Sequence, residues 1–230
     1  MRHFIEELDE LQKKLLEMAG LVESGIHKSV LALTEQDESV AQEVLRNEAR
    51  INQLEIEIDD FAVGLMAMYQ PMARDLRFLT AAIKINGDLE RMGDLAVGIV
   101  ERALSLIYQP PVKPLIDIPQ MAKLVESMVR RSLDSFVKRD SELSRAVLLS
   151  DDAVDELRDA IYRELIDFME RDPRTVSRAV DLMFIARNLE RIADHATNIS
   201  EDVIFWVLGA DVRHHAQAAS ASPRPERSEP

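Results

Sequence analysis

Apolar residues recur at intervals of three and four along most of the chain. The first stretch is typical, with apolar side chains at Leu8, Leu11, Leu15, Met18 and Leu21. This spacing places the apolar side chains on one face of an α-helix. The chain has few aromatic residues (1 Trp, 3 Tyr and 7 Phe) and only 7 glycines, which is poor material for sheets and their turns. The pattern therefore indicates long helices.

Prolines mark the helix boundaries, because proline breaks helix interiors but suits first turns and connections. The 9 prolines leave four long proline-free stretches, of which the first and the third each need one internal break. Thr34 or Asp37 could cap the helix after the first break, and the matching break falls near Asp140. We expect six helices, over 3–33, 37–69, 72–108, 117–138, 140–170 and 173–208.

The two halves of the chain repeat each other. Met18–Ser29 and Met121–Ser132, 103 positions apart, are identical at 7 of 12 positions. Asp88–Glu101 and Asn188–Glu201, 100 positions apart, are identical at 7 of 14 positions, where chance would give about one. The change of offset indicates a three-residue deletion near the second connection of the second half.

The repeat predicts an all-α fold of two tandem, pseudo-symmetric three-helix bundles. Short connections favour antiparallel neighbours, so we expect six long antiparallel helices. The first bundle should cover residues 1–109, a proline-rich linker 110–119, and the second bundle 120–210. Residues 211–230 are rich in Ala, Ser and Pro without apolar periodicity, and we expect a disordered tail there.

Charge and composition exclude several classes of protein. The formal net charge of −14 argues against a nucleic-acid binder, which needs a surplus of Lys and Arg on one face. The chain has no cysteine, so thiolate metal sites and cysteine nucleophiles are excluded, and a reducing cytosol is compatible with the composition. We expect no signal peptide, because the N-terminus turns acidic at once, and no membrane insertion, because no apolar run is long enough.

Pairs of carboxylates four residues apart, and therefore on one helix face, are the candidate chemistry. One pair recurs at the same repeat position in both halves, and a third lies on the preceding helix of the first half. A fourth pair, on the fifth helix, does not fall in register with the third. Oxygen ligands of this kind suit magnesium, calcium, manganese or iron. The candidate ligands are Glu90 and Asp94, Glu190 and Asp194, Glu55 and Asp59, and Asp155 and Asp159.

The spacing alone is weak evidence for a metal. With 42 acidic residues, the chain contains 7 such pairs, as many as chance predicts. Two carboxylates four residues apart repel each other. Surface ion pairs with Arg91 and Arg191, or with Arg77 and Arg187, would offset this repulsion as well as a metal ion would. His195 could join a metal cluster beside Asp194, but a lone helical histidine is more often packed or solvated. No catalytic apparatus is visible, and no Glu-x-x-His pair supports a ferritin-like oxidase.

Two segments of the first half carry a specific signature. Gln70–Arg77 reads QPMARDLR and Asp88–Asp94 reads DLERMGD, and in the second half Ala186–Asp194 reads ARNLERIAD. These segments closely resemble the signature of the PhoU family, bacterial accessory proteins of the phosphate-specific transport system. The resemblance covers about residues 4–214 and includes the doubled architecture.

The resemblance implies a cytoplasmic homodimer that acts as a negative regulator of the phosphate-starvation response. Such proteins are thought to connect the ATPase subunit of the phosphate ABC transporter with a membrane sensor histidine kinase, and they restrain phosphate uptake. Members of the family hold metal ions, in some cases iron or zinc clusters, through Glu/Asp-x-x-x-Asp motifs. The metal here could equally be magnesium or manganese.

Matched to those motifs, Glu90, Asp94, Glu190 and Asp194 are the strongest expected ligands, with Glu55 and Asp59 on the second helix of the first half. Asp155 and Asp159 are a weaker match, because Arg158 stands where the acid falls in register.

Two positions depart from the family signature. Ala193 replaces the usual Gly, and Gly98 replaces the usual Asn. Either departure could weaken one metal site relative to the other.

The sequence leads us to expect an adaptor without catalytic activity. Two other classes of function stay open. A carboxylate-bridged metalloenzyme, such as a phosphohydrolase or a di-iron oxidase, would turn over a phosphoester or consume oxygen with Fe(II). A purely structural scaffold would bind no metal.

Overall fold

The computed structural model describes residues 2–210 and Val212. Within these residues the chain forms seven α-helices and one short 3₁₀ helix and no strand. The elements are α1 (Arg2–Glu35), α2 (Glu38–Tyr69), α3 (Ala73–Leu106), α4 (Asp117–Lys138), α5 (Ser141–Leu148), α6 (Asp151–Arg171), η1 (Pro173–Thr175) and α7 (Val176–Leu208). The expected tail over 211–230 lies outside the described residues except for Val212, whose side chain is buried.

Aspartate side chains cap the two helices that follow the predicted internal breaks. Asp37 accepts a hydrogen bond from the Ser39 amide at the start of α2. Asp140 accepts bonds from the amides of Glu142 and Leu143 at the start of α5. Each carboxylate satisfies amides that have no partner inside the helix and interacts favourably with the helix dipole. Of the two caps considered from the sequence, Asp37 is therefore the one used.

The single helix expected over 140–170 is wrong, because the structure divides it into α5 and α6. The Ser150 hydroxyl donates to the Ala146 carbonyl and accepts from Arg131 of α4. This local bond competes with the regular helix ladder. Leu149 beside it is 84% exposed.

The last helix also starts later than the expected position 173. Pro173–Thr175 form the 3₁₀ turn η1, and α7 begins at Val176. The Asp172 carboxylate accepts from the Arg174 amide at the start of this turn.

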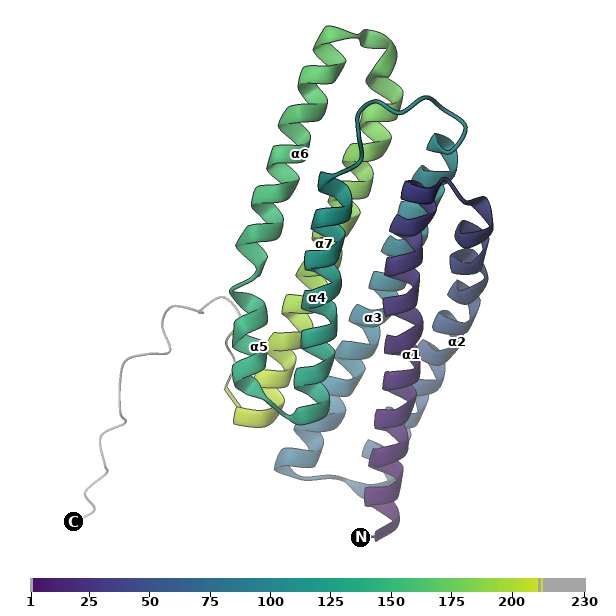
Figure 1. The fold of residues 1–230 in the computed structure, drawn as a ribbon. Coiled ribbons are helices and arrows are strands. Elements are labelled where there is room, and N and C mark those ends of the chain that lie inside the picture. The colour runs from purple at the N-terminus through teal and green to yellow at the C-terminus, as the bar shows by residue number, and fades with distance from the viewer. Residues whose placement is uncertain (1, 211, 213–230) are drawn as a thin grey trace, which may run out of the picture.

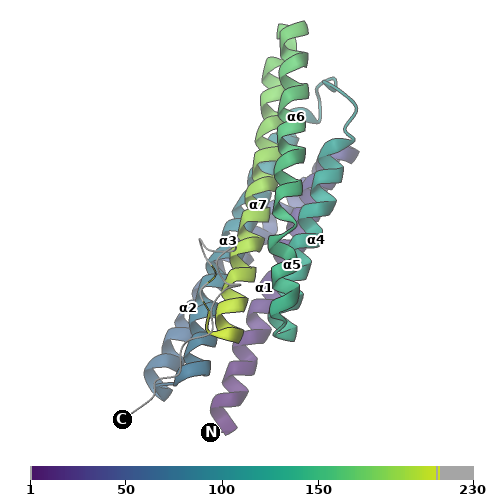
Figure 2. The same cartoon turned by 90° about the vertical axis from the view of Figure 1, so that its left-hand side faces the viewer.

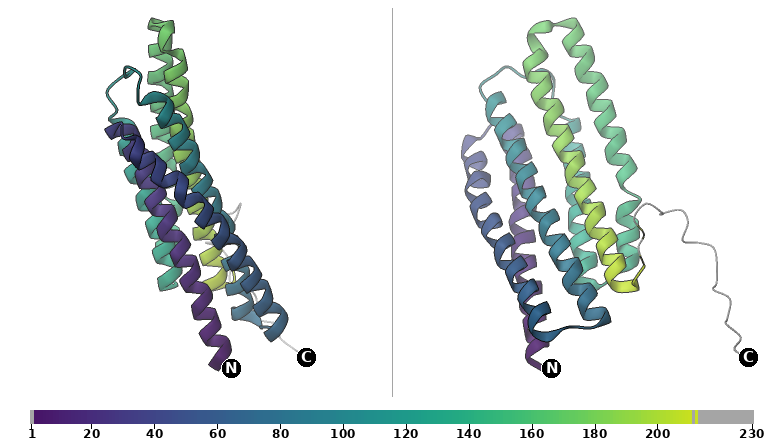
Figure 3. Two further views of the ribbon diagram at one scale, coloured as in Figure 1. Left: turned by 90° about the vertical axis from the view of Figure 1, so that its right-hand side faces the viewer. Right: turned by 180° about the vertical axis from the view of Figure 1, so that it is seen from behind.

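The helices form two halves that lie side by side, with α1–α3 in one and α4–α7 in the other (Figure 1). Seen edge-on, the molecule is long and narrow (Figure 2). From behind, α3 and α7 lie next to each other at the centre, flanked by α2 on one side and α6 on the other (Figure 3). α3 packs along α7 and α1 packs against α4, so two helix pairs join the halves. No helix among the described residues is long and apolar enough to cross a membrane.

The buried positions of α2 and of α5–α6 follow the repeat at an offset of 103. Val44, Ile51, Ile58 and Ala62 are buried, and so are their equivalents Val147, Val154, Ile161 and Leu165. The break between α5 and α6 therefore leaves the register of the repeat unchanged. This register fixes which side chains of the two halves correspond.

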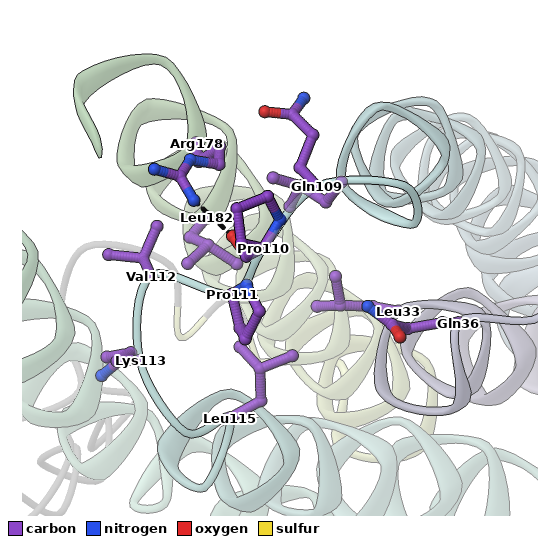
Figure 4. Close-up of a pocket in the computed structure, with 11 residues that line it drawn as sticks. Leu33, Gln36, Gln109, Pro110, Pro111, Val112, Lys113, Leu115, Arg178 and Leu182 are labelled. Atoms are coloured by element: carbon purple, nitrogen blue, oxygen red, sulfur yellow. Dashed lines mark hydrogen bonds between the residues drawn. The ribbon is translucent and has the colours of Figure 1, made fainter. Parts of the chain in front are cut away.

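The proline-rich linker covers one end of the bundle, where it closes a small apolar pocket (Figure 4). Leu33, Leu106 and Leu182 contribute to its wall. The Arg178 guanidinium donates to the Pro110 carbonyl. Lys113 is only 5% exposed and pairs with carboxylates of α4 and α6. The linker is thus part of the packed structure.

Candidate metal centres

The first carboxylate cluster consists of Glu55, Asp59, Glu90 and Asp94 and lies between α2 and α3. Burial raises the pKa of Glu90 above its ordinary value, and the nearby carboxylates of Asp94 and Glu55 raise it further. Glu90 is also hydrogen-bonded to Asp94. The fold therefore brings three of the four predicted ligands together, on facing turns of two helices.

Asp59 lies one turn further along α2 and is held by Asn86. The fully buried Asn86 amide donates to Asp59 Oδ1 and to the Glu55 carbonyl, each at 2.9 Å. The carbonyl oxygen of the same side chain is buried and has no hydrogen-bond partner. A buried acceptor without a partner is costly, so the amide is held in place by the two bonds that its nitrogen donates. Sequence reasoning missed Asn86, because its role depends on the packing of α3 against α2.

The second carboxylate cluster consists of Asp151, Asp155, Asp159, Glu190 and Asp194, between α6 and α7. Burial raises the pKa of Glu190 and of Asp194. The Asp194 charge adds to the effect on Glu190, and the Asp155 charge adds to the effect on Asp194. Asp159 is 61% exposed and is joined to the other carboxylates through Arg158. The structure thus gathers Asp155, Glu190 and Asp194 as predicted and leaves Asp159 at the edge.

Asp151 is a member of the second cluster that sequence reasoning missed. Burial, followed by the charges of Asp194 and Asp155, raises its pKa from 3.8 to about 6. The signal was present, because Asp151 precedes Asp155 by four residues. At the repeat offset it corresponds to Glu48, which is not one of the candidate ligands.

Arg158 lies within the second cluster. Its Nη1 is 2.9 Å from Asp155 Oδ1 and 2.6 Å from Glu190 Oε1, and its Nη2 is 2.9 Å from Asp159 Oδ1. The guanidinium therefore neutralises part of the cluster and ties α6 to α7. Of the arginines suggested for this role from the sequence, Arg91 and Arg191 act through their charge on Glu90 and Asp194, whereas Arg77 donates to the Trp206 carbonyl.

Within the described residues, no three His, Asp or Glu side chains lie close enough together to hold a metal ion in their present rotamers. Metal binding at either cluster therefore requires side-chain rotation. The first cluster has the chemistry for a hard cation, with carboxylate oxygens and the unpartnered Asn86 carbonyl. The second cluster does not fit a metal as it lies, because Arg158 occupies it.

His195 does not join Asp194. Its Nδ1 lies 2.8 Å from Asp88 Oδ1 across the contact between α7 and α3, and both side chains are buried. The Asn198 amide also donates to Asp88, at 3.4 Å. These contacts join the two repeats and lie outside both clusters.

The two departures from the family signature have structural counterparts. A Cβ at Gly93 would lie 3.2 Å from Ile51 Cδ1, whereas the equivalent pair in the second half is Ala193 and the smaller Val154. One methyl group is thus moved from one helix to the other. A Cβ at Gly98 would lie only 2.7 Å from the Asn188 amide nitrogen, so Gly98 makes room for that side chain.

Comparison with known proteins agrees with the doubled architecture. The PhoU domain matches twice, over residues 15–103 and 118–203. The chain is 42% identical over 209 residues to the "Phosphate-specific transport system accessory protein PhoU homolog" of Aquifex aeolicus, covering 91% of this chain and 95% of the relative. It is 40% identical over 214 residues to the protein of the same name from Pseudomonas putida, covering 93% of this chain and 84% of the relative.

Two crystal structures share the fold. PhoU from Pseudomonas aeruginosa superposes with a TM-score of 0.88 at 38% identity, covering 90% of this chain and all of that chain. The phosphate transport system regulatory protein PhoU from Streptococcus pneumoniae superposes with a TM-score of 0.85 at 29% identity, covering 91% of this chain and 99% of that chain. The fold, the repeat and the identity over most of the length lead to one conclusion: the chain belongs to the PhoU family.

Proposed function

We propose that this protein is a regulatory accessory protein of a phosphate-specific transport system. In this role it restrains phosphate uptake and the phosphate-starvation response. It acts as a cytoplasmic homodimeric adaptor between the ATPase subunit of the transporter and a sensor histidine kinase, without catalytic activity of its own. The observation that carries the proposal is the family match in both repeats, together with relatives named as accessory proteins of that transport system.

The metal part of the proposal rests on the first cluster. Glu90 and Glu55 come from different helices, and the charge of Glu55 adds to burial and to the charge of Asp94 in raising the pKa of Glu90. A bound magnesium, manganese, iron or zinc ion would remove that repulsion and draw α2 and α3 together. The face formed by these helices would then be fixed for a partner protein.

Affinity capture from a phosphate-replete lysate of the native host, solubilised in mild detergent, tests the adaptor role. We expect the transporter ATPase or the sensor kinase to be recovered with the wild-type bait. A Glu90→Gln/Asp94→Asn bait should recover less of either, because it lacks two ligands. Glu6→Gln/Glu10→Gln is the matched control, since these exposed carboxylates are also four residues apart but lie on α1. Absence of both partners from the wild-type bait, when both are detected in the input, contradicts the adaptor role.

One observation favours a second candidate, a carboxylate-bridged metalloenzyme. Burial and neighbouring carboxylates raise the pKa of Asp151 to about 6, within reach of the pH at which general acids and bases exchange protons, and burial followed by the charges of Asp94 and Glu55 raises the pKa of Glu90 above its ordinary value. Phosphoester turnover by the metal-loaded protein, or oxygen consumption with Fe(II), would support the enzyme. Loss of that activity in the Glu90→Gln variant would locate it.

A further inference from the structure

The two repeats carry opposite charges at one equivalent position. At the offset of 103, Glu55 of α2 corresponds to Arg158 of α6. The register is firm, because Ile51 and Ile58 on either side are buried like their equivalents Val154 and Ile161. The charge reversal therefore occurs at the same point of the fold, facing the Glu-x-x-x-Asp pair of the next helix.

In the second repeat, the guanidinium of Arg158 lies among the carboxylates, where a metal ion would otherwise bind. Arg158 bonds to Asp155 and Asp159 on its own helix and to Glu190 on α7, at 2.6 to 2.9 Å. Its side chain is only 23% exposed, which reduces screening of these pairs by water. A guanidinium stays charged at any physiological pH and donates in several directions at once, so it satisfies carboxylates from both helices.

The first repeat has no such group. Among the described residues, no lysine or arginine forms an ion pair with Glu55, Glu90 or Asp94. Arg91, which is exposed, acts on Glu90 through its charge. The buried Asn86 carbonyl oxygen next to Glu55 and Asp59 has no partner. Within the part of the chain that the structure describes, no basic side chain therefore does in the first cluster what Arg158 does in the second.

We propose that Arg158 is the built-in cation of the second cluster, so that the chain takes a metal ion at the first repeat and not at the second. A metal at the second cluster would have to displace the guanidinium from three carboxylates. The two copies of the motif thus differ in function. Arg158 always neutralises the second cluster, whereas the charge of the first cluster depends on whether a metal ion is bound. The inference rests on the metal part of the proposed function and adds a stoichiometry to it.

Mn²⁺ binding to the full chain tests the proposal, after removal of metal with a chelator. Free and bound Mn²⁺ are counted by electron paramagnetic resonance. We expect one class of site in the wild type, lost in Glu90→Gln/Asp94→Asn and retained in Glu190→Gln/Asp194→Asn. Arg158→Gln should gain a further Mn²⁺ per chain, and adding Glu190→Gln/Asp194→Asn to it should remove that gain.

Two variants control for charge and position. Arg158→Lys keeps a cation in the cluster and should bind no additional Mn²⁺. Arg163→Gln removes an exposed arginine of the same helix that donates to the Asp159 carbonyl, and it should bind Mn²⁺ as the wild type does. Far-UV circular dichroism checks that every variant keeps its helices.

Three results overturn the proposal. The first is loss of wild-type Mn²⁺ binding in the Glu190→Gln/Asp194→Asn variant, and the second is no gain in folded Arg158→Gln. The third is no Mn²⁺ binding by any variant, which also removes the metal part of the proposed function. Recovery of the transporter ATPase or the kinase in the affinity capture would then still support the accessory role, so the two failures are distinguishable.

Discussion

Replacing Asp151 by asparagine should stabilise the metal-free protein at alkaline pH and leave its stability unchanged in acid. Burial and the charges of Asp194 and Asp155 raise the pKa of Asp151 from 3.8 to about 6. The folded state therefore holds its proton to higher pH than the unfolded state does. As pH rises from 3.8 to about 6, the unfolded chain ionises first, and the free energy of unfolding falls. Asparagine has the same shape and no charge, so it avoids this loss.

The size of the effect follows from the pKa shift of Asp151. A change from 3.8 to about 6 corresponds to about 3 kcal/mol, and partial exposure of the side chain makes this an upper bound. Asp151 is also the first residue of α6, where a negative charge interacts favourably with the helix dipole by about 0.3 to 1 kcal/mol. We expect a net gain of about 1 to 2 kcal/mol at about pH 8, or roughly 3 to 6 °C in Tm for a chain of this length.

Thermal and urea unfolding of both proteins, in chelator and across the range from about pH 4 to about pH 8, measure the difference. The free energy of unfolding of Asp151→Asn should rise relative to that of the wild type as pH rises through the pKa of Asp151. Asp152→Asn is the matched control, because Asp152 is the exposed neighbour in the same first turn. A difference between Asp151→Asn and wild type that does not change with pH would refute the reasoning. So would an equal gain in the control.

Three further substitutions probe the contacts between and beside the repeats. Gly98→Ala places a Cβ 2.7 Å from the Asn188 amide nitrogen, so this half-buried side chain must rotate and lose its bond to the Leu95 carbonyl. Because alanine is favoured over glycine in a helix by about 1 kcal/mol, we expect the free energy of unfolding in urea to change by less than about 1 kcal/mol, and Asn188→Ala in the same chain to remove the clash. Asp88→Ala leaves the buried His195 ring without its acceptor and should cost about 1 to 3 kcal/mol, whereas an unchanged unfolding midpoint would contradict the buried pair. Lys113→Met removes the anchor of the linker and should speed limited proteolysis there. Equal cleavage rates in variant and wild type would count against a packed linker.

Local signals were sufficient to predict most of the fold. Prolines and capping aspartates determine where helices start, and they are visible in the sequence, so the boundaries at Asp37 and Asp140 were found. The break between α5 and α6 was missed because it depends on Ser150, whose hydroxyl is held by Arg131 from another helix. No pattern of apolar residues records such a contact.

The candidate site was predicted in part for the same reason. Spacing of four along one helix brought out Glu90 and Asp94, which do face each other. The arginine in register was also visible, but its bond to Glu190 depends on how α6 packs against α7. The Asp88 and His195 pair lies 107 positions apart in the chain, between two repeats, and nothing local in the sequence joins the two residues.

The duplication explains why the differences between the repeats fall where they do. Core positions must fill the same space in both copies, and the pair Gly93 and Ile51 becomes Ala193 and Val154 with little change in total volume. Positions of α2 and α6 that lie outside the apolar core need not fill the same space in both repeats. At one such position Glu55 stands in the first repeat and Arg158 in the second, and the buried register on either side is the same.

The contact between the repeats shows the same freedom. Asp88 pairs with His195 on one side of the contact between α3 and α7. The equivalent residues on the other side are Asn188 and Leu95, and there the Asn188 amide donates to the Leu95 carbonyl. Both solutions give a polar side chain at this contact a hydrogen-bond partner, but only one places an ionisable pair between the halves. A symmetric scaffold with two asymmetric polar contacts is therefore able to present different chemistry on its two halves while keeping one core.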